Sequence, residues 1–142
     1  RKKEVYDGAL PSGNSVMAAN LYKLSLYYNS PEWREKSQSA VKSLGRAIKN
    51  HPVSFGNWGC LFQEMVFGTK ELAILGKDYS EIHDALLNYY LPHKILMCSH
   101  TSNNQFPLLS DKKPGERTRI YLCQNYACQL PVSSVNELKA IL

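Results

Sequence analysis

The chain has 142 residues, 44% of them hydrophobic and 20% charged, with a formal net charge of +5. These values are typical of an ordinary globular chain with a buried core, and no apolar run approaches the roughly 18 residues that a membrane-spanning helix needs. The basic side chains are spread along the sequence with acids between them, which argues against a nucleic-acid partner despite the positive charge.

The chain opens on a loop rich in Gly, Pro and Asn, Tyr6–Ser15, which leads into a helix expected over Val16–Tyr28. Ser12 is placed to cap this helix, and the glycines and proline of the loop fix a special backbone path. The helix is apolar on nearly every side, with Lys23 as its only charge, so we expect it to be buried all round. A polar loop with one carboxylate, Asp7, at the mouth of a buried helix is a reasonable place for a binding site.

Two further helices follow. Ser30 begins an amphipathic surface helix that ends near Asn50, and Ser54 begins a third helix, Phe55–Phe67, which is apolar enough to be buried. Buried, surface and buried helices in this order are what a double-ringed helical toroid requires, whereas a simple bundle would make every helix amphipathic. Three helices cannot close such a ring, and the chain begins at Arg1 without a methionine, so we expect a fragment of a longer protein.

From Gly68 the pattern changes to short strands and helices. Strands are expected at Glu71–Gly76, Lys94–Cys98 and Thr118–Cys123, and helices at Asp78–Tyr90 and Val135–Leu142. A strand, a helix and a strand in succession predict a right-handed crossover between two parallel strands.

Three motifs occur in the same order in one known family: Tyr6–Ser15, Glu71–Gly76 and Tyr121–Pro131. On these motifs, and over essentially its whole length, the chain resembles the C-terminal part of the thioredoxin-domain-containing proteins related to spermatogenesis-associated protein 20. The resemblance implies an upstream thioredoxin-like domain followed by a six-hairpin, glycosidase-like helical toroid. The fold expected is therefore mainly α, with residues 1–67 as the last hairpins of that toroid and residues 68–142 as a C-terminal α/β segment of the same domain.

The resemblance implies a function only through the fold. It favours a carbohydrate-related enzyme or sugar-binding domain, glycosidase- or sugar-epimerase-like, without a cofactor. The alternative, from a different class, is a non-catalytic scaffold or chaperone-like partner of the upstream thioredoxin-like domain. The expected partners are a carbohydrate ligand and that upstream domain, with neither nucleic acid nor membrane. Because no secretion signal is visible, the expected location is the cytoplasm.

Asp7 is the candidate catalytic carboxylate, because a glycosidase needs two acids on either side of the scissile bond. Glu64, the single charge of the third helix, is the candidate for the second acid. The structural alternative is that Asp7 accepts hydrogen bonds from backbone amides of its own turn and shapes the loop. Four residues are candidates for contacting the substrate by hydrogen bonds or stacking: Tyr6, Ser12, Asn14 and Trp58.

The four cysteines are Cys60, Cys98, Cys123 and Cys128, and the last two are separated by four residues. This spacing leaves three interpretations open. A zinc site would need two further ligands, for which Cys98 and His100 are the candidates, and no histidine has the spacing of a known metal motif. A disulfide or redox pair is the second interpretation, and buried structural thiols are the third.

Overall fold

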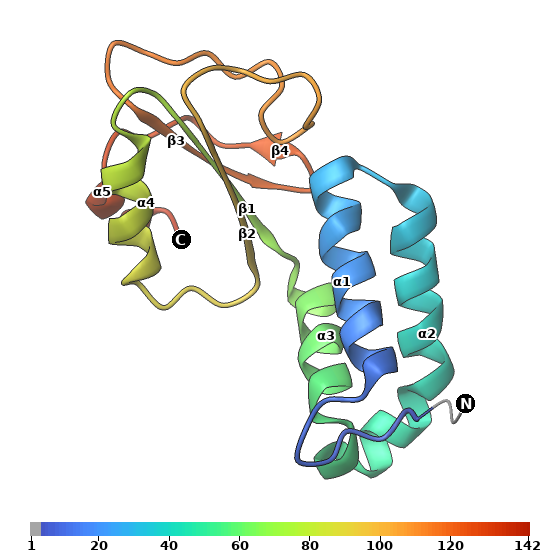
Figure 1. Cartoon of the computed structure of the whole chain (residues 1–142). Coiled ribbons are helices and arrows are strands. Elements are labelled where there is room, and N and C mark those ends of the chain that lie inside the picture. The colour runs from blue at the N-terminus through green and yellow to red at the C-terminus, as the bar shows by residue number, and fades with distance from the viewer. Residues whose placement is uncertain (1–3) are drawn as a thin grey trace. The chain divides into compact units, whose positions relative to one another are not determined.

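The computed structural model describes residues 4–142 and divides the chain into a helical unit that ends at Phe67 and a sheet unit from Gly68 to Leu142 (Figure 1). The helical unit contains α1 (Gly13–Tyr28), α2 (Pro31–Asn50), the short 3-10 helix η1 (Pro52–Phe55) and α3 (Gly56–Phe67). The sheet unit contains β1 (Lys70–Leu75), α4 (Tyr79–Leu87), β2 (Lys94–Ser99), β3 (Arg119–Gln124), β4 (Ala127–Cys128) and α5 (Val135–Ala140). Among residues 4–142, none of the helices combines the length and the apolar character that crossing a membrane requires.

Local capping signals fix where α1 and α2 begin. The Ser12 side chain accepts a hydrogen bond of 3.1 Å from the backbone N–H of Ser15, and the Ser30 side chain accepts one from Trp33. Pro31 occupies the first position of α2, where its missing N–H costs no hydrogen bond. Both predicted N-caps are confirmed.

The three long helices of the helical unit pack against one another, so that each contacts the other two. The core between them consists of Ala18, Tyr22, Leu26, Val41, Ile48, Phe55, Trp58 and Leu61. The expectation that α1 is buried all round is wrong, because Val16, Met17, Leu24 and Tyr28 are exposed. The buried positions of α1 recur every three or four residues, which is one stripe of a helix.

The expected six-hairpin toroid is also wrong. The described residues form a small α/β fold with five α-helices and one four-stranded mixed sheet. The toroid was expected from the family resemblance and from an alternation of inner and outer helices, but α1 and α3 both expose apolar side chains and all three helices share one core. Hydrophobic composition alone therefore did not distinguish a helix that is buried all round from one that is buried along a single stripe.

The sheet has the strand order β2-β1-β3-β4. The pairing of β1 with β2 is parallel, as the strand–helix–strand pattern predicted, with Leu72 opposite Leu96. The pairing of β1 with β3 is antiparallel, with Leu72 opposite Leu122, and β4 returns antiparallel to β3. The sequence predicted neither β4 nor the antiparallel pairings.

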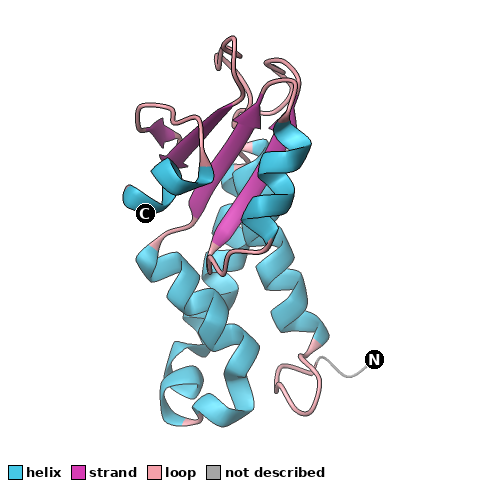
Figure 2. Ribbon diagram, turned by 90° about the vertical axis from the view of Figure 1, so that its left-hand side faces the viewer, coloured by secondary structure: helices cyan, strands magenta, loops and turns pink. Residues whose placement is uncertain are grey.

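Both helices of the sheet unit cover the same face of the sheet (Figure 2). The core on that face consists of Leu72, Ile74, Leu86, Leu91, Ile120, Leu122 and Leu138. Side chains alternate between the faces of a strand, so Glu71 of β1 and Tyr121 and Cys123 of β3 belong to the opposite face. The Tyr121 hydroxyl there donates a hydrogen bond of 2.8 Å to the backbone oxygen of Lys113, so the long loop between β2 and β3 reaches this face.

Candidate functional site

Asp7 connects the starts of α1 and α3 through a single carboxylate. Its Oδ1 accepts hydrogen bonds from the Ser12 backbone N–H at 2.8 Å and the Ser15 hydroxyl at 2.7 Å. Its Oδ2 accepts from the backbone N–H groups of Asn57 at 2.9 Å and Trp58 at 3.3 Å. Helix N-termini carry unpaired N–H groups and a partial positive charge, so a carboxylate is stabilised there. Asp7 thus serves two helix starts, and we call this arrangement the Asp7 clasp.

Two opposing effects act on the pKa of Asp7. Burial raises it, since desolvation disfavours the charged form, but the hydrogen bonds from Ser12, Ser15, Trp58 and Asn57 together lower it below its ordinary value. A carboxyl group with a lowered pKa is ionised at neutral pH and is a poor general acid. The side chain is also only 8% exposed, so the clasp favours the structural role for Asp7.

The loop before α1 is bound at two further points, one in η1 and one at the start of α3. The Asp7 backbone N–H donates to the Ser54 carbonyl at 2.9 Å, and the Trp58 indole N–H donates to the Val5 carbonyl at 2.9 Å. The expectation that Ser54 caps the third helix is wrong, because Ser54 lies within η1 (Pro52–Phe55). Instead, the N–H groups of Asn57 and Trp58 at the start of α3 donate hydrogen bonds to the Asp7 carboxylate. Asp7 lies fifty residues before Asn57 in the sequence.

The residues expected to contact a substrate lie around Asp7, since Ser12 and Trp58 both bond to its carboxylate, but most of them are buried or already hydrogen-bonded. The ring of Trp58 is 2% exposed and has no free face for stacking, and Ser12 is a buried helix cap. Asn14 is exposed, but its amide donates to the backbone oxygen of Glu4. Tyr6 alone of the four presents an exposed ring.

Glu64, the second acid expected, lies near the end of α3. It is buried, and it follows Trp58 by six residues, which is about 9 Å along a helix axis. Asp7 contacts the opposite end of the same helix. Neither carboxylate lines any of the three cavities described for residues 4–142.

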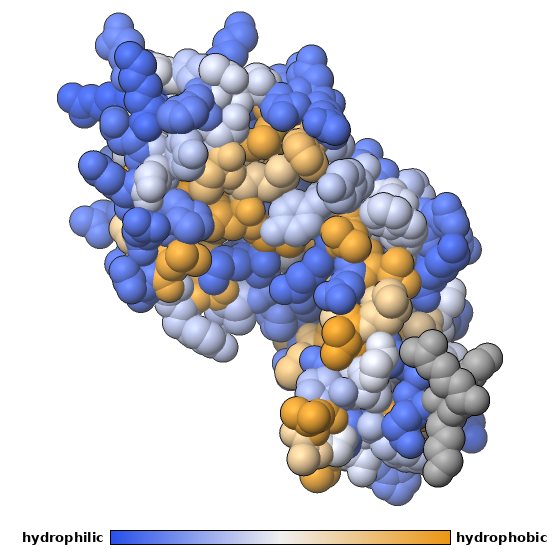
Figure 3. Space-filling model, in the orientation of Figure 1, coloured by the Kyte–Doolittle hydropathy of each residue, from blue (hydrophilic) through white to orange (hydrophobic). Residues whose placement is uncertain are grey.

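A groove of about 720 Å³ lies between α2 and α3, and we call it the α2–α3 groove. Its lining includes the buried Val41 and Ile48 of α2 and the exposed Phe62 and Val66 of α3, together with Gly45. Figure 3 shows further apolar surface, in orange, on the helical unit. An apolar groove of this size on a single unit is a candidate interaction surface.

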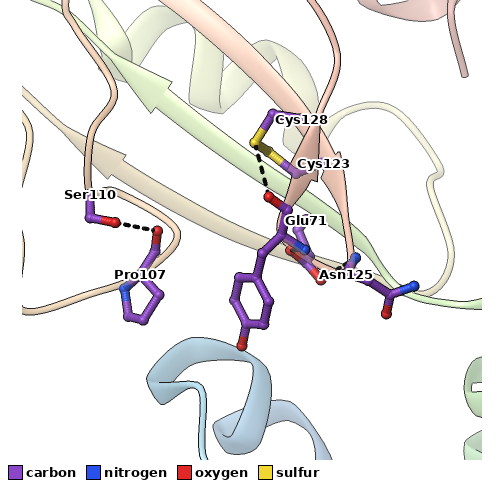
Figure 4. Close-up of a disulfide and its surroundings, with 7 residues drawn as sticks. Glu71, Pro107, Ser110, Cys123, Asn125 and Cys128 are labelled. Carbon is purple, nitrogen blue, oxygen red and sulfur yellow. Dashed lines mark hydrogen bonds between the residues drawn. A yellow bond between two sulfur atoms is a disulfide. The ribbon is translucent and has the colours of Figure 1, made fainter.

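Cys123 and Cys128 form a disulfide across the β3–β4 hairpin, where they are directly opposite each other (Figure 4). Cys123 is 2% exposed and Cys128 is exposed. The other two cysteines, Cys60 and Cys98, are free. Within residues 4–142, no group of three or more His, Cys, Asp or Glu side chains could hold a metal ion, so the structure does not assemble the zinc site considered above.

Glu71 is a candidate functional residue that sequence reasoning missed. It is 1% exposed, and its two carboxylate oxygens accept hydrogen bonds from the backbone N–H groups of Asn125 at 3.0 Å and Tyr126 at 3.1 Å. These two residues form the hairpin turn, with φ angles of 52° and 62°. The signals were an acid in an apolar strand and two cysteines, Cys123 and Cys128, placed symmetrically about a two-residue turn.

Comparison with curated proteins shows similarity along the whole chain. Spermatogenesis-associated protein 20 of mouse is 28% identical over 152 residues, which cover 100% of this chain and 19% of that protein. The human protein of that name is 27% identical over 152 residues with the same coverage. An uncharacterised protein of Caenorhabditis elegans is 21% identical over 148 residues, which cover 99% of this chain and 20% of that protein.

The resemblance to spermatogenesis-associated protein 20, first noted from three motifs, is therefore confirmed as homology. The chain spans about a fifth of the length of the curated relatives it matches. No family model matches the chain, and no solved structure matches it.

Proposed function

We propose that this chain is a non-catalytic scaffold within a longer protein. The observation that carries the proposal is the Asp7 clasp, which commits both oxygens of the candidate catalytic carboxylate to hydrogen bonds with Ser12, Ser15, Asn57 and Trp58. A general acid or a nucleophile must present a free oxygen to its substrate, within hydrogen-bond reach. Asp7 instead stabilises the local fold.

The α2–α3 groove is the surface through which such a scaffold would act. Its apolar lining fits the apolar stripe of an amphipathic helix, a common mode of helix recognition. Lys42 and Lys49 also line it, which favours a helix with acidic residues beside the stripe. The relatives are about five times as long as this chain, so another segment of the same polypeptide is the proposed occupant. The resemblance noted from the motifs makes an upstream thioredoxin-like domain the candidate source of that helix.

Sugar binding is the competing proposal, and its support is the exposed ring of Tyr6 beside the loop. The test is a thermal-shift titration of the chain with a panel of mono- and disaccharides, repeated with Asp7→Asn. The scaffold proposal predicts no saturable shift with any sugar and a lower melting temperature for Asp7→Asn without sugar.

The competing proposal predicts the opposite pattern. A saturable shift that disappears in Asp7→Asn, while the melting temperature of the variant without sugar equals that of the wild type, would establish a sugar site at the loop and overturn the scaffold proposal. Tyr6→Leu serves as the second variant, because it removes the exposed ring without touching the clasp. Loss of a sugar response in Tyr6→Leu alone would place the site at Tyr6 and would also contradict a pure scaffold.

A further inference from the structure

The β3–β4 hairpin holds two cysteines face to face by means that do not depend on the bond between them. Cys123 and Cys128 are opposite each other in the antiparallel ladder, and Asn125 and Tyr126 complete the hairpin between them. The carboxylate of Glu71, on the neighbouring strand β1, accepts hydrogen bonds from the backbone N–H groups of both turn residues. Figure 4 shows Glu71 beside Asn125 and the disulfide. The two thiols would therefore stay close together after reduction.

The disulfide is also accessible from one side. Cys128 is exposed, whereas Cys123 is 2% exposed, so an incoming thiol reaches the Cys128 sulfur first. The disulfide closes a loop with only four residues between the cysteines, and such a short loop gains less stability from closure than a long one, because the entropy of closure grows with loop length. Breaking this bond therefore disturbs the fold less than breaking a long-range bridge.

A cavity of about 360 Å³ adjoins the hairpin, and its lining includes Cys123, Gln124, Gln129 and Lys70. The rest of the lining is apolar (Leu122, Ala127, Ile141 and Leu142), and among these described residues the Lys70 ammonium is the one charged side chain, which suits a small anionic molecule. The cavity reaches the disulfide through Cys123, so an anionic thiol bound there lies next to the bond.

We propose that Cys123–Cys128 is a reversible thiol–disulfide exchange site for an anionic low-molecular-weight thiol of the glutathione class. The thiolate of the small molecule attacks the Cys128 sulfur, the Cys123–Cys128 bond breaks, and Cys123 leaves as a thiolate that takes a proton from water. A second small thiolate attacks the sulfur of the first one in the mixed disulfide and releases Cys128. Two electrons pass to the protein, and two small thiols become one small disulfide. The same small disulfide drives the reverse reaction.

Glu71 is the positioning residue of this site. By holding the turn in place, it keeps Cys123 and Cys128 at a high effective concentration in the reduced state, so that the bond re-forms within the molecule. It touches neither sulfur in a chemical step. Its role is to favour closure over reaction with a second molecule.

The first experiment incubates the whole chain in glutathione redox buffers under native conditions, followed by alkylation and peptide mass analysis. We expect Cys123 and Cys128 to change together between disulfide and alkylated thiol while the circular dichroism spectrum stays native. The trapped glutathione adduct is expected on Cys128. Reduction that occurs only in denaturant, or an adduct on Cys123 instead, would overturn the proposal.

The second experiment compares matched variants. Glu71→Gln loses an acceptor at the turn, and re-formation of the disulfide is expected to slow by about tenfold. Glu81→Gln, the same change at an exposed site on α4, is the control and is expected to leave the rate unchanged. Alkylation of the half-buried Cys98 reports unfolding, so slow closure in Glu71→Gln with normal Cys98 protection separates positioning from loss of fold. Equal closure rates in both variants would remove Glu71 from the proposal.

The third experiment tests the cavity. Reduction by anionic glutathione is compared with reduction by cationic cysteamine in Lys70→Gln and in the control Lys77→Gln, which changes the net charge equally at an exposed position. We expect the preference for glutathione to fall several-fold in Lys70→Gln alone. An equal fall in both variants would show that only the overall charge acts, and no preference in the wild type would exclude the anionic ligand.

Discussion

The Oδ2 atom of Asp7 lies 2.9 Å from the backbone nitrogen of Asn57, fifty residues farther along the chain. This bond joins the loop before α1 to the first turn of α3, and the second oxygen of the same carboxylate bonds to Ser12 and Ser15. The two helices therefore begin at one shared anion. A sequence motif that resembles an active-site loop accordingly has a sufficient explanation in the stability of the helical unit.

Replacing Asp7 with asparagine is expected to lower the free energy of unfolding by at least about 2 kcal/mol. The amide nitrogen of asparagine cannot accept: at the Oδ2 position it would face the N–H groups of Asn57 and Trp58, and at the Oδ1 position it would face that of Ser12, so at least one buried N–H group is left without its acceptor. The ionised acceptor is lost in either orientation. Urea unfolding followed by circular dichroism measures the change. Glu4→Gln, at an exposed position near the same loop, is the control, and an unchanged urea midpoint for Asp7→Asn would contradict the clasp.

The pH dependence of stability follows from the lowered pKa of Asp7. A carboxyl group whose pKa is lower in the folded state stabilises the fold above its unfolded pKa of about 3.9, and that stabilisation is lost as the pH falls through the folded pKa. The difference in stability between the wild type and Asp7→Asn is therefore expected to be constant near neutral pH and to shrink below about pH 4. Urea midpoints of both proteins from pH 7 to pH 2.5 test this, and a difference independent of pH would refute it.

The α2–α3 groove can be blocked from the inside at Gly45. A Cβ atom at this position meets no atom within 4 Å, and Gly45 lines the groove, so a side chain added there starts into open space. Gly45→Trp is expected to fill the groove and abolish the fluorescence of bound anilinonaphthalene sulfonate, an apolar dye with a negative charge. Gly45→Ala, the control, should keep the dye and stabilise α2 by about 0.5–1 kcal/mol. Dye fluorescence that persists in Gly45→Trp would place the apolar binding surface elsewhere.

Elements whose signals are local were predicted well from the sequence. The N-caps of α1 and α2 were predicted because Ser12 and Ser30 act on N–H groups three residues away, although α1 begins at Gly13 and not at the expected Val16. The parallel pairing of β1 with β2 was predicted because a strand–helix–strand order leaves few topologies. The strand order of the whole sheet and strand β4 were not predicted, since they depend on pairings between distant segments.

The site was harder to predict for the same reason. Asp7 was recognised as special, but its bonding to Asn57 crosses fifty residues, and no local pattern distinguishes such a clasp from a catalytic acid. Glu71 was missed because its partners, Asn125 and Tyr126, lie more than fifty residues away. The burial of α1 was overestimated because composition shows how apolar a helix is and not how many neighbours it has.

A bond between α1 and α2 allows a paired test of the helical unit. The hydroxyl of Ser37 on α2 donates to the backbone oxygen of Ala18 on α1 at 2.7 Å, with both residues buried. Ser43 lies on the same helix, but its hydroxyl donates at 2.7 Å to Ala40 of α2 itself, at an exposed position. Replacing either serine with alanine raises the intrinsic helix propensity by the same amount, so the difference between the two variants isolates the bond between helices.

Ser37→Ala is expected to lower the free energy of unfolding by about 1 kcal/mol, which is the net value of a buried neutral hydrogen bond. Ser43→Ala is expected to change it by less than about 0.5 kcal/mol in either direction, as is usual for exposed sites. Urea unfolding of both variants under the same conditions measures the difference. If Ser37→Ala proves as stable as Ser43→Ala, the bond to Ala18 contributes nothing, and α1 and α2 are held together by apolar packing alone.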